Sequence, residues 1–159
     1  MPTDCISFRD TAYASKLICD YVEKHPKLQS LYNRYPTLEN FKPQLNAKKA
    51  EFSITKREVL VSSLLKQYAE WIPSEPLTSR ILSLAKENTF TVTTGHQLNL
   101  LGGPIYFLYK IITTINLAKE LKIKYPENNY IPIFWMASED HDFEEINHFN
   151  FQNKRFQWS

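Results

Sequence analysis

Two polar clusters in the second half of the chain have residue types and spacings suited to catalysis. The first comprises Thr93, Thr94, Gly95, His96 and Gln97, with Asn99, Gly102, Gly103 and Pro104 close behind. His96 can donate a hydrogen bond to phosphate oxygens or to charge that develops in a transition state. The side-chain amides of Gln97 and Asn99 can orient a ligand. All of the chain's glycines, 3 in number, fall in this cluster, which favours a functional loop. The alternative is a connector whose polar side chains satisfy the loop backbone.

The second cluster is acidic and contains Ser138, Glu139, Asp140, His141 and Asp142, followed by Glu144, Glu145 and His148. Such groups can bind a ribose or an amine, act as acid and base, or hold a metal. The metal is the weakest of these hypotheses, because the spacing of His141 and His148 is not a specific ligand spacing. The alternative is a solvated loop that caps a short helix, with Asp142 as the cap and Glu145 three residues later. Capping and catalysis are compatible.

Tyr106 and Lys110 are four residues apart on a predicted helix, so they share one side of it. Lys110 can face the same site as a phosphate partner, or it can extend its ammonium group to solvent. The tryptophans, Trp71, Trp135 and Trp158, are expected in the core or in an interface.

The elements around these clusters predict a strand, a helix and a second strand. Residues 89–94 are rich in β-branched side chains and predict a strand, and residues 95–103 predict a loop. Pro104 opens a predicted helix to Lys124, whose expected buried stripe is Leu108, Ile111, Ile112, Ile115 and Leu121. Residues 130–136 form a continuous apolar run, typical of a strand covered on both faces.

A strand–helix–strand order predicts a parallel crossover, which is right-handed in almost every protein. Both polar clusters then follow the carboxyl ends of neighbouring strands, where open α/β sheets bind their ligands. The helix start at Pro104 adds unpaired amides and a positive dipole end suited to phosphate. Two strands alone leave unpaired edges, so we expect the incomplete first part of a larger sheet, with a further strand beginning at Phe149 and Phe151.

The first half of the chain predicts helices. We expect them from Asp10 or Ser15 to Lys24, over residues 27–32, 53–71 and 76–87, with a loop between Pro36 and Pro43. The predicted organisation is therefore a helical region at residues 1–87 and an α/β region at residues 88–159.

Composition narrows the class of protein. A hydrophobic fraction of 43%, a charged fraction of 23% and a net charge of +2 are typical of a globular domain without a nucleic-acid-binding surface. The cysteines, Cys5 and Cys19, form neither a metal motif nor a disulfide framework, which favours a reducing cytoplasm. The longest apolar run, residues 105–121, is interrupted by charge, so we expect no membrane span, and no secretory signal is visible at the N-terminus.

The segments TTGHQLNLLGGPIY at residues 93–106 and PIFWMASEDHDFEEINH at residues 132–148, with Lys110 between them, closely resemble one family. That family is the bacillithiol-biosynthesis cysteine-adding enzymes, the BshC cysteine ligases, and the resemblance covers residues 90–149. It implies a Rossmann-like core similar to class I aminoacyl-tRNA synthetases and other HIGH-type nucleotidyltransferases. Residues 93–96 would stand at the HIGH signature, with Thr93 in place of its first histidine.

The resemblance also implies an activity, which is the joining of cysteine to glucosaminyl-malate in the last step to bacillithiol. ATP or another nucleotide would activate the cysteine carboxylate, and the sugar amine would then attack it. The implied catalytic residues are His96, Glu139, His141 and Asp142. The implied nucleotide- and substrate-binding residues are Thr93, Thr94, Gly95, Gln97, Asn99, Gly103, Tyr106, Lys110 and Asp140.

Members of this family are longer and dimerise through a C-terminal helical coiled coil, so the chain is expected to be an N-terminal segment. No metal ligand is assigned, and the resemblance leaves open whether a metal recognises the cysteine thiol. Two alternatives remain: a non-catalytic segment that only binds the ligand, and a metal-dependent hydrolase that uses the acidic cluster.

Overall fold

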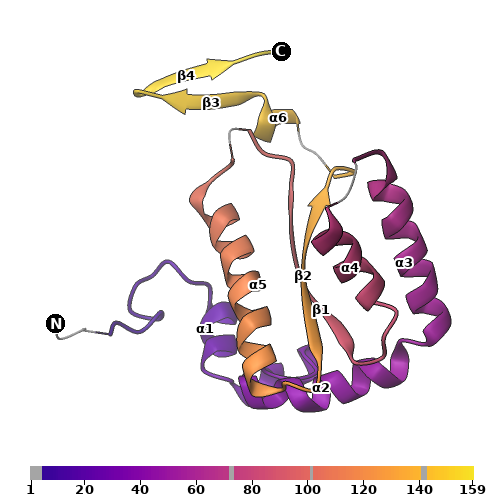
Figure 1. Cartoon of the computed structure of the whole chain (residues 1–159). Coiled ribbons are helices and arrows are strands. Elements are labelled where there is room, and N and C mark those ends of the chain that lie inside the picture. The colour runs from indigo at the N-terminus through magenta and orange to yellow at the C-terminus, as the bar shows by residue number, and fades with distance from the viewer. Residues whose placement is uncertain (1–4, 72–73, 101, 141–142) are drawn as a thin grey trace. The chain divides into compact units, whose positions relative to one another are not determined.

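The computed structural model describes residues 5–71, 74–100, 102–140 and 143–159, which form a mixed α/β chain (Figure 1). The elements are α1 (Lys16–Val22), the 3-10 helix η1 (Pro26–Leu31), α2 (Leu38–Glu51), α3 (Ile54–Tyr68), the 3-10 helix η2 (Ala69–Trp71), α4 (Glu75–Ser83), β1 (Thr89–Gln97), α5 (Ile105–Lys124), β2 (Asn129–Ala137), α6 (Phe143–Ile146), β3 (His148–Phe151) and β4 (Lys154–Gln157). The chain divides into two compact units, residues 1–46 and 47–159. The boundary at residues 87 and 88 stays a prediction.

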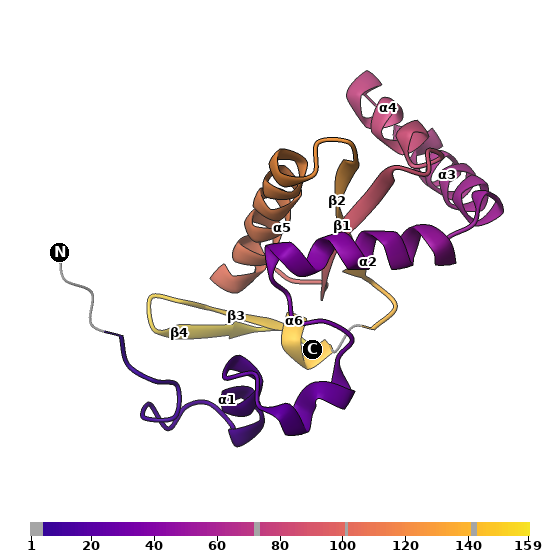
Figure 2. The ribbon, with the colours of Figure 1, turned by 90° about the horizontal axis from the view of Figure 1, so that it is seen from below.

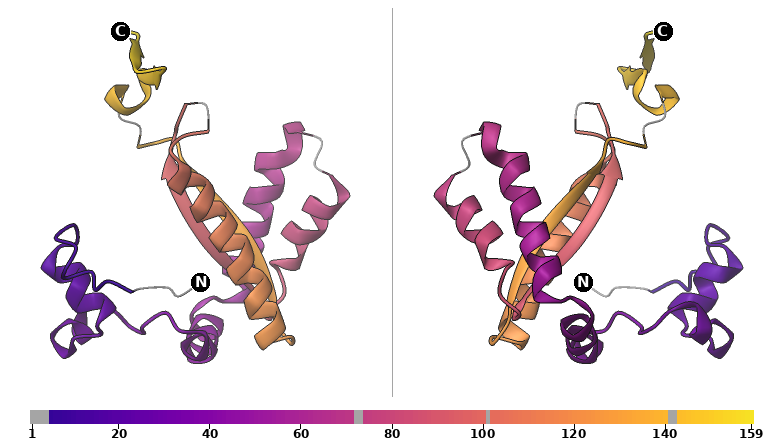
Figure 3. Two further views of the ribbon diagram at one scale, coloured as in Figure 1. Left: turned by 90° about the vertical axis from the view of Figure 1, so that its left-hand side faces the viewer. Right: turned by 90° about the vertical axis from the view of Figure 1, so that its right-hand side faces the viewer.

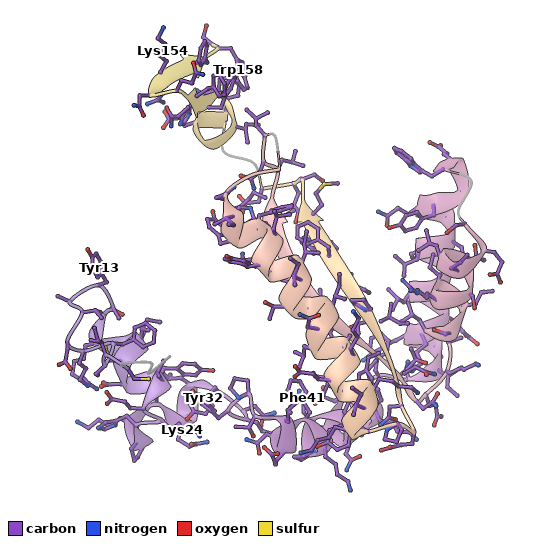
Figure 4. All side chains as sticks on the ribbon, turned by 60° about the vertical axis from the view of Figure 1, so that its left-hand side comes forward. Tyr13, Lys24, Tyr32, Phe41, Lys154 and Trp158 are labelled. Atoms are coloured by element: carbon purple, nitrogen blue, oxygen red, sulfur yellow. The ribbon has the colours of Figure 1, made fainter. Side chains whose placement is uncertain are left out.

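The first unit is held by an aromatic cluster and an ion-pair network. Ser15 caps α1, as predicted, by accepting a hydrogen bond from the third residue after it. Asp20 is 8% exposed and pairs with both Arg9 and Lys16. The aromatic cluster consists of Tyr21, Tyr32 and Tyr35, whose ring centroids are 5.2–6.2 Å apart. Lys24 Nζ lies over the Tyr35 ring. Figure 4 labels Tyr32 and Lys24 in this unit.

The predicted loop between Pro36 and Pro43 was wrong, because α2 begins at Leu38 and contains Pro43. Proline fixes φ near the helical value, and within a helix it removes one hydrogen bond of the ladder. Here the first turn is anchored by Asn40, whose backbone N–H donates to the Thr37 carbonyl and whose side chain donates to the Tyr35 carbonyl at 2.8 Å. The two prolines alone therefore did not determine whether residues 38–43 form a loop or a helix.

A buried arginine joins α3 and α4 to the start of β1. Arg57, on α3, is 4% exposed and donates through Nη1 to the carbonyl oxygens of Leu84 at 3.0 Å and Thr89 at 2.9 Å. Its Nη2 donates to the Glu87 carbonyl at 3.3 Å. The guanidinium thus lies at the carboxyl end of α4, where helix carbonyls lack partners and the dipole favours a cation. Figure 2 shows α3 and α4 side by side.

β1 and β2 form a parallel pair, which confirms the predicted crossover. The register runs from Thr89 opposite Asn129 to Gln97 opposite Ala137. α5 connects the strands and packs against both of them along their length (Figures 1 and 3). The pattern of β-branched and apolar residues therefore predicted both strands, and the long apolar run predicted the covering helix.

β1 continues to Gln97, so the prediction of a loop from residue 95 was wrong for its first three residues. Gly95 lies opposite Trp135 in the ladder. A Cβ at Gly95 would lie 2.8 Å from the Trp135 carbonyl oxygen and 3.0 Å from its Cβ. Here glycine permits a close approach between strands rather than a turn, and pairing extends past it.

The side of α5 that faces the strands differs from the predicted one. The buried residues are Thr114, Ala118 and Leu121, and Phe107 and Ile111 continue this stripe as half-buried residues. The predicted stripe was right at Ile111 and Leu121. It was wrong at Leu108, Ile112 and Ile115, which are 51%, 51% and 37% exposed. Because α5 is apolar around most of its circumference, two stripes fit the helical period. The helical period alone does not choose between them, and packing against β1 and β2 selects one.

β2 is not covered on both faces as predicted, because Trp135 and Met136 are 59% and 60% exposed at its carboxyl end. The predicted strand at Phe149 and Phe151 is present as β3, but it pairs antiparallel with β4 in a separate sheet. The turn between them has positive φ at two consecutive residues, as tight hairpins require. Figure 4 marks Lys154 and Trp158 on this terminal hairpin. Among the described residues, every helix is too short or too polar to cross a membrane.

Candidate functional site

The polar clusters meet at one end of the parallel pair, which we call the carboxyl edge and define as residues 95–100, 102, 103 and 135–140. Because β1 and β2 are parallel and in register, His96 lies opposite Met136 and Gln97 opposite Ala137. The loops that leave both strands therefore start at the same level. Gln97 Nε2 donates to Asp140 Oδ2 at 3.3 Å, which links the first cluster directly to the second.

His96 is the centre of a hydrogen-bond network at this edge. Its Nδ1 lies 2.8 Å from Asn99 Nδ2, and its Nε2 lies 3.1 Å from the Tyr106 hydroxyl. The imidazole also contacts the Phe107 ring, at 5.8 Å between centroids, and Phe107 packs edge-on against Phe134 at 5.0 Å. β1, its loop and the first turn of α5 thus hold the imidazole from three sides.

The two phenylalanines under His96 were not singled out from the sequence. Phe107 comes from α5 and Phe134 from β2, and both are half-buried. Phe107 lies four residues before Ile111, so it belongs to the stripe that α5 turns toward the strands. Assigning that stripe correctly would have placed Phe107 beneath the site.

Lys110 lies at the α5 side of the edge. Its Nζ donates to the Gly95 carbonyl oxygen at 3.2 Å and lies 5.8 Å from the centroid of the Tyr106 ring. The expected shared side of Tyr106 and Lys110 is therefore present. The ammonium group could either face the site or extend to solvent away from it. In the structure it lies at the end of β1, where it makes this side of the edge cationic.

The opposite side of the edge is anionic. Glu139 and Asp140 follow β2 and are exposed, and Glu139 Oε1 accepts a hydrogen bond from the indole Nε1 of Trp135 at 3.3 Å. Trp135 was expected in the core or an interface. It is exposed here because successive side chains of a strand point to opposite faces, and its neighbour Phe134 is the one that contacts α5, through Phe107. A ligand with both an anionic and a cationic group fits such a division of charge.

Other expected site residues are not joined to the network. Thr93 and Thr94 lie on β1 and make no side-chain hydrogen bond within the described part of the chain. His141 and Asp142 lie outside the described residues, as does any capping of α6 by Asp142. Within residues 5–71, 74–100, 102–140 and 143–159, no group of three or more His, Cys, Asp or Glu side chains is arranged to hold a metal.

A parallel strand pair crossed by one helix, with polar loops at its carboxyl edge, defines a Rossmann-like α/β protein. Comparison with known families narrows the class, because residues 1–159 match the family described as bacillithiol biosynthesis BshC, N-terminal Rossmann-like domain. The chain belongs to this family.

Curated relatives of the chain have the same assignment. Three proteins, each named "Putative cysteine ligase BshC", come from Flavobacterium psychrophilum, Flavobacterium johnsoniae and Christiangramia forsetii. They are 58%, 57% and 54% identical to the chain over 160, 159 and 159 residues, and the alignments cover 100% of it. The chain spans 30% of the length of these curated relatives.

Proposed function

We propose that the chain provides the nucleotide- and substrate-binding edge of a cysteine ligase in bacillithiol biosynthesis. The reaction is the formation of an amide between the carboxylate of cysteine and the amine of glucosaminyl-malate. The observation that carries the proposal is the hydrogen bond between Gln97 and Asp140, which brings both family-like segments to one edge. The names of the relatives support the reaction class.

The residues of the edge fit a nucleotide phosphate. Lys110 offers an ammonium group, and Tyr106, a half-exposed residue, offers a hydroxyl. Both lie in the first two turns of α5, whose positive dipole end attracts anions. A bound nucleotide would supply the group that turns the cysteine carboxylate into an electrophile. Thr93, Thr94, Gly95 and His96 would form the neighbouring end of β1, in the position proposed for a HIGH-type signature, with Thr94 and His96 on one face of the strand and Thr93 on the other.

The acidic side of the edge fits the amines. Glu139 and Asp140 are exposed carboxylates that can hold an ammonium group or accept its proton when the amine attacks. His141 and Asp142 are proposed to share this work. Gln97 and Asn99 would orient the ligand or the catalytic side chains rather than exchange protons, because an amide has no titratable group in this pH range.

We also propose that the complete protein acts in the cytoplasm as a homodimer, with a C-terminal coiled coil as the contact. These parts of the proposal depend on the family and not on the carboxyl edge.

The test is amide formation from cysteine, glucosaminyl-malate and ATP by the complete protein, followed by mass spectrometry. Lys110→Met removes a charged hydrogen-bond donor worth about 1.5–3 kcal/mol, so we expect KM for ATP to rise roughly 10- to 100-fold. The matched control is Lys119→Met, an exposed lysine farther along α5, with an unchanged KM. Absence of the amide product, or equal KM values in the two variants, would refute the proposal.

A further inference from the structure

Both ring nitrogens of His96 have partners, so the imidazole itself has no spare donor. Nδ1 lies 2.8 Å from Asn99 Nδ2 and 3.1 Å from the Gln97 carbonyl oxygen, and Nε2 lies 3.1 Å from the Tyr106 hydroxyl. A neutral imidazole carries one proton on its ring nitrogens, either on Nδ1 or on Nε2. The protonated nitrogen donates a hydrogen bond and the other accepts one, so the choice decides which partners donate.

Asn99 resolves this choice. Its Nδ2 also lies 3.0 Å from the Gln97 carbonyl oxygen, which can only accept. The amide nitrogen must therefore face both partners, and its two hydrogens go to the Gln97 oxygen and to His96 Nδ1. The opposite orientation of the amide would place its oxygen against a carbonyl oxygen. Nδ1 is then an acceptor, and the proton of the ring lies on Nε2. The 3.1 Å contact between Nδ1 and the Gln97 oxygen then joins two acceptors, and Asn99 donates one hydrogen to each of them. The opposite orientation would instead join two oxygens at the shorter distance of 3.0 Å and leave both amide hydrogens without these partners.

We propose that Asn99 is a positioning residue that holds His96 as the Nε2–H tautomer. Nε2–H then donates to the oxygen of Tyr106, which leaves the phenolic proton of Tyr106 directed away from His96. The hydroxyl of Tyr106 is therefore a free donor at the carboxyl edge, and the residue is 50% exposed. The tautomer rests on the orientation of the Asn99 amide, whereas donation by Tyr106 to an anionic oxygen of the ligand rests on the proposed function.

Gly103 is the second positioning residue. Its φ is +68°, and a Cβ added there would lie 2.9 Å from Asn99 Cβ and 3.0 Å from Asn99 Cγ. The neighbouring Gly102 has φ of +87°, but a Cβ there would meet no described atom within 4 Å. Alanine is strained by the backbone at both positions, and only at Gly103 does it also displace Asn99. Alanine at Gly102 therefore tests the effect of backbone strain alone, and alanine at Gly103 tests the same strain together with the displacement of Asn99.

The experiment is long-range ¹H–¹⁵N NMR of protein labelled in its histidines, at a pH where imidazole is neutral, with His96 assigned by its loss in His96→Gln. We expect Nε2–H in the wild type, in Gly102→Ala and in Tyr106→Phe, because none of these changes moves Asn99. Asn99→Ala and Gly103→Ala should give a mixture of tautomers. Asn99→Asp should move the proton to Nδ1, because a carboxylate only accepts.

An amide fingerprint spectrum checks that each variant is folded. Nδ1–H in the wild type would overturn the inference, as would an unchanged tautomer in folded Asn99→Asp. The measurement needs neither ligand nor turnover. Protein with the expected tautomer and no ligase activity would therefore refute only the proposed function, and active protein with the opposite tautomer would refute only this inference.

Discussion

Replacing Arg57 by methionine tests whether one buried side chain joins α3 and α4 to β1. The guanidinium donates to three carbonyl oxygens at 3.0, 2.9 and 3.3 Å, and the residue is 4% exposed. Methionine occupies similar space but donates nothing, so the carbonyls of Leu84, Glu87 and Thr89 lose their partner. We expect the second unit to lose stability rather than to rearrange locally.

The magnitude follows from two opposing effects. A hydrogen bond to a charged group contributes about 1.5–3 kcal/mol, so the two shorter bonds amount to roughly 3–6 kcal/mol. Methionine avoids the desolvation of a buried guanidinium, whose Nε has no hydrogen-bond partner among the described residues, and this offsets part of the loss. We expect the free energy of unfolding to fall by about 3 kcal/mol, with Arg57→Lys in between because one ammonium group reaches fewer carbonyls.

Urea unfolding followed by tryptophan fluorescence measures this change, because Trp71, Trp135 and Trp158 all lie in the second unit. With a slope of about 2 kcal/mol/M, the midpoint of Arg57→Met should fall by about 1.5 M. Arg80→Met is the control, since Arg80 is an exposed arginine on α4, and it should change stability by less than about 0.5 kcal/mol. Equal midpoints for the two variants would refute the role assigned to the guanidinium.

Two further predictions concern a helix cap and an ion pair. Ser53→Ala should lower the free energy of unfolding by about 1 kcal/mol in the same urea assay, because the hydroxyl caps α3. Ser74→Ala should lower it far less, because Ser74 makes no side-chain cap bond to α4. Equal losses in the two variants would contradict the assignment of the Ser53 cap. Hydrogen bonds from Lys16 and then Arg9 lower the pKa of Asp20 from 3.8 to about 2. The folded carboxyl thus titrates below the unfolded one, so its stabilising effect is complete above about pH 4 and is lost as the pH falls toward about 2. Amide exchange in α1 should show this loss in the wild type and not in Asp20→Asn, and identical pH profiles would contradict it.

The strands and the capped helix starts could be predicted from the sequence because their determinants are local. β-branched and apolar runs define β1 and β2, and Ser15 and Ser53 accept hydrogen bonds from backbone groups three residues away. The meeting of the two polar clusters also followed from order along the chain, since parallel strands present their carboxyl ends at one edge. The family was likewise recognisable from two short segments.

Tertiary structure decided the features that depend on what packs against a residue. α5 is apolar on several sides, and contact with the strands selected the stripe through Thr114 and Ala118. Gly95 extends the ladder because it lies opposite Trp135, a partner 40 positions farther along the chain by their numbers. The roles of Asn99 and Tyr106 around His96 depend on distances between side chains from a loop and a helix, which spacing along the chain does not determine. Local preferences therefore set the elements and the edge, whereas the hydrogen bonds around His96 depend on how the loop after β1 and the first turn of α5 lie against the imidazole.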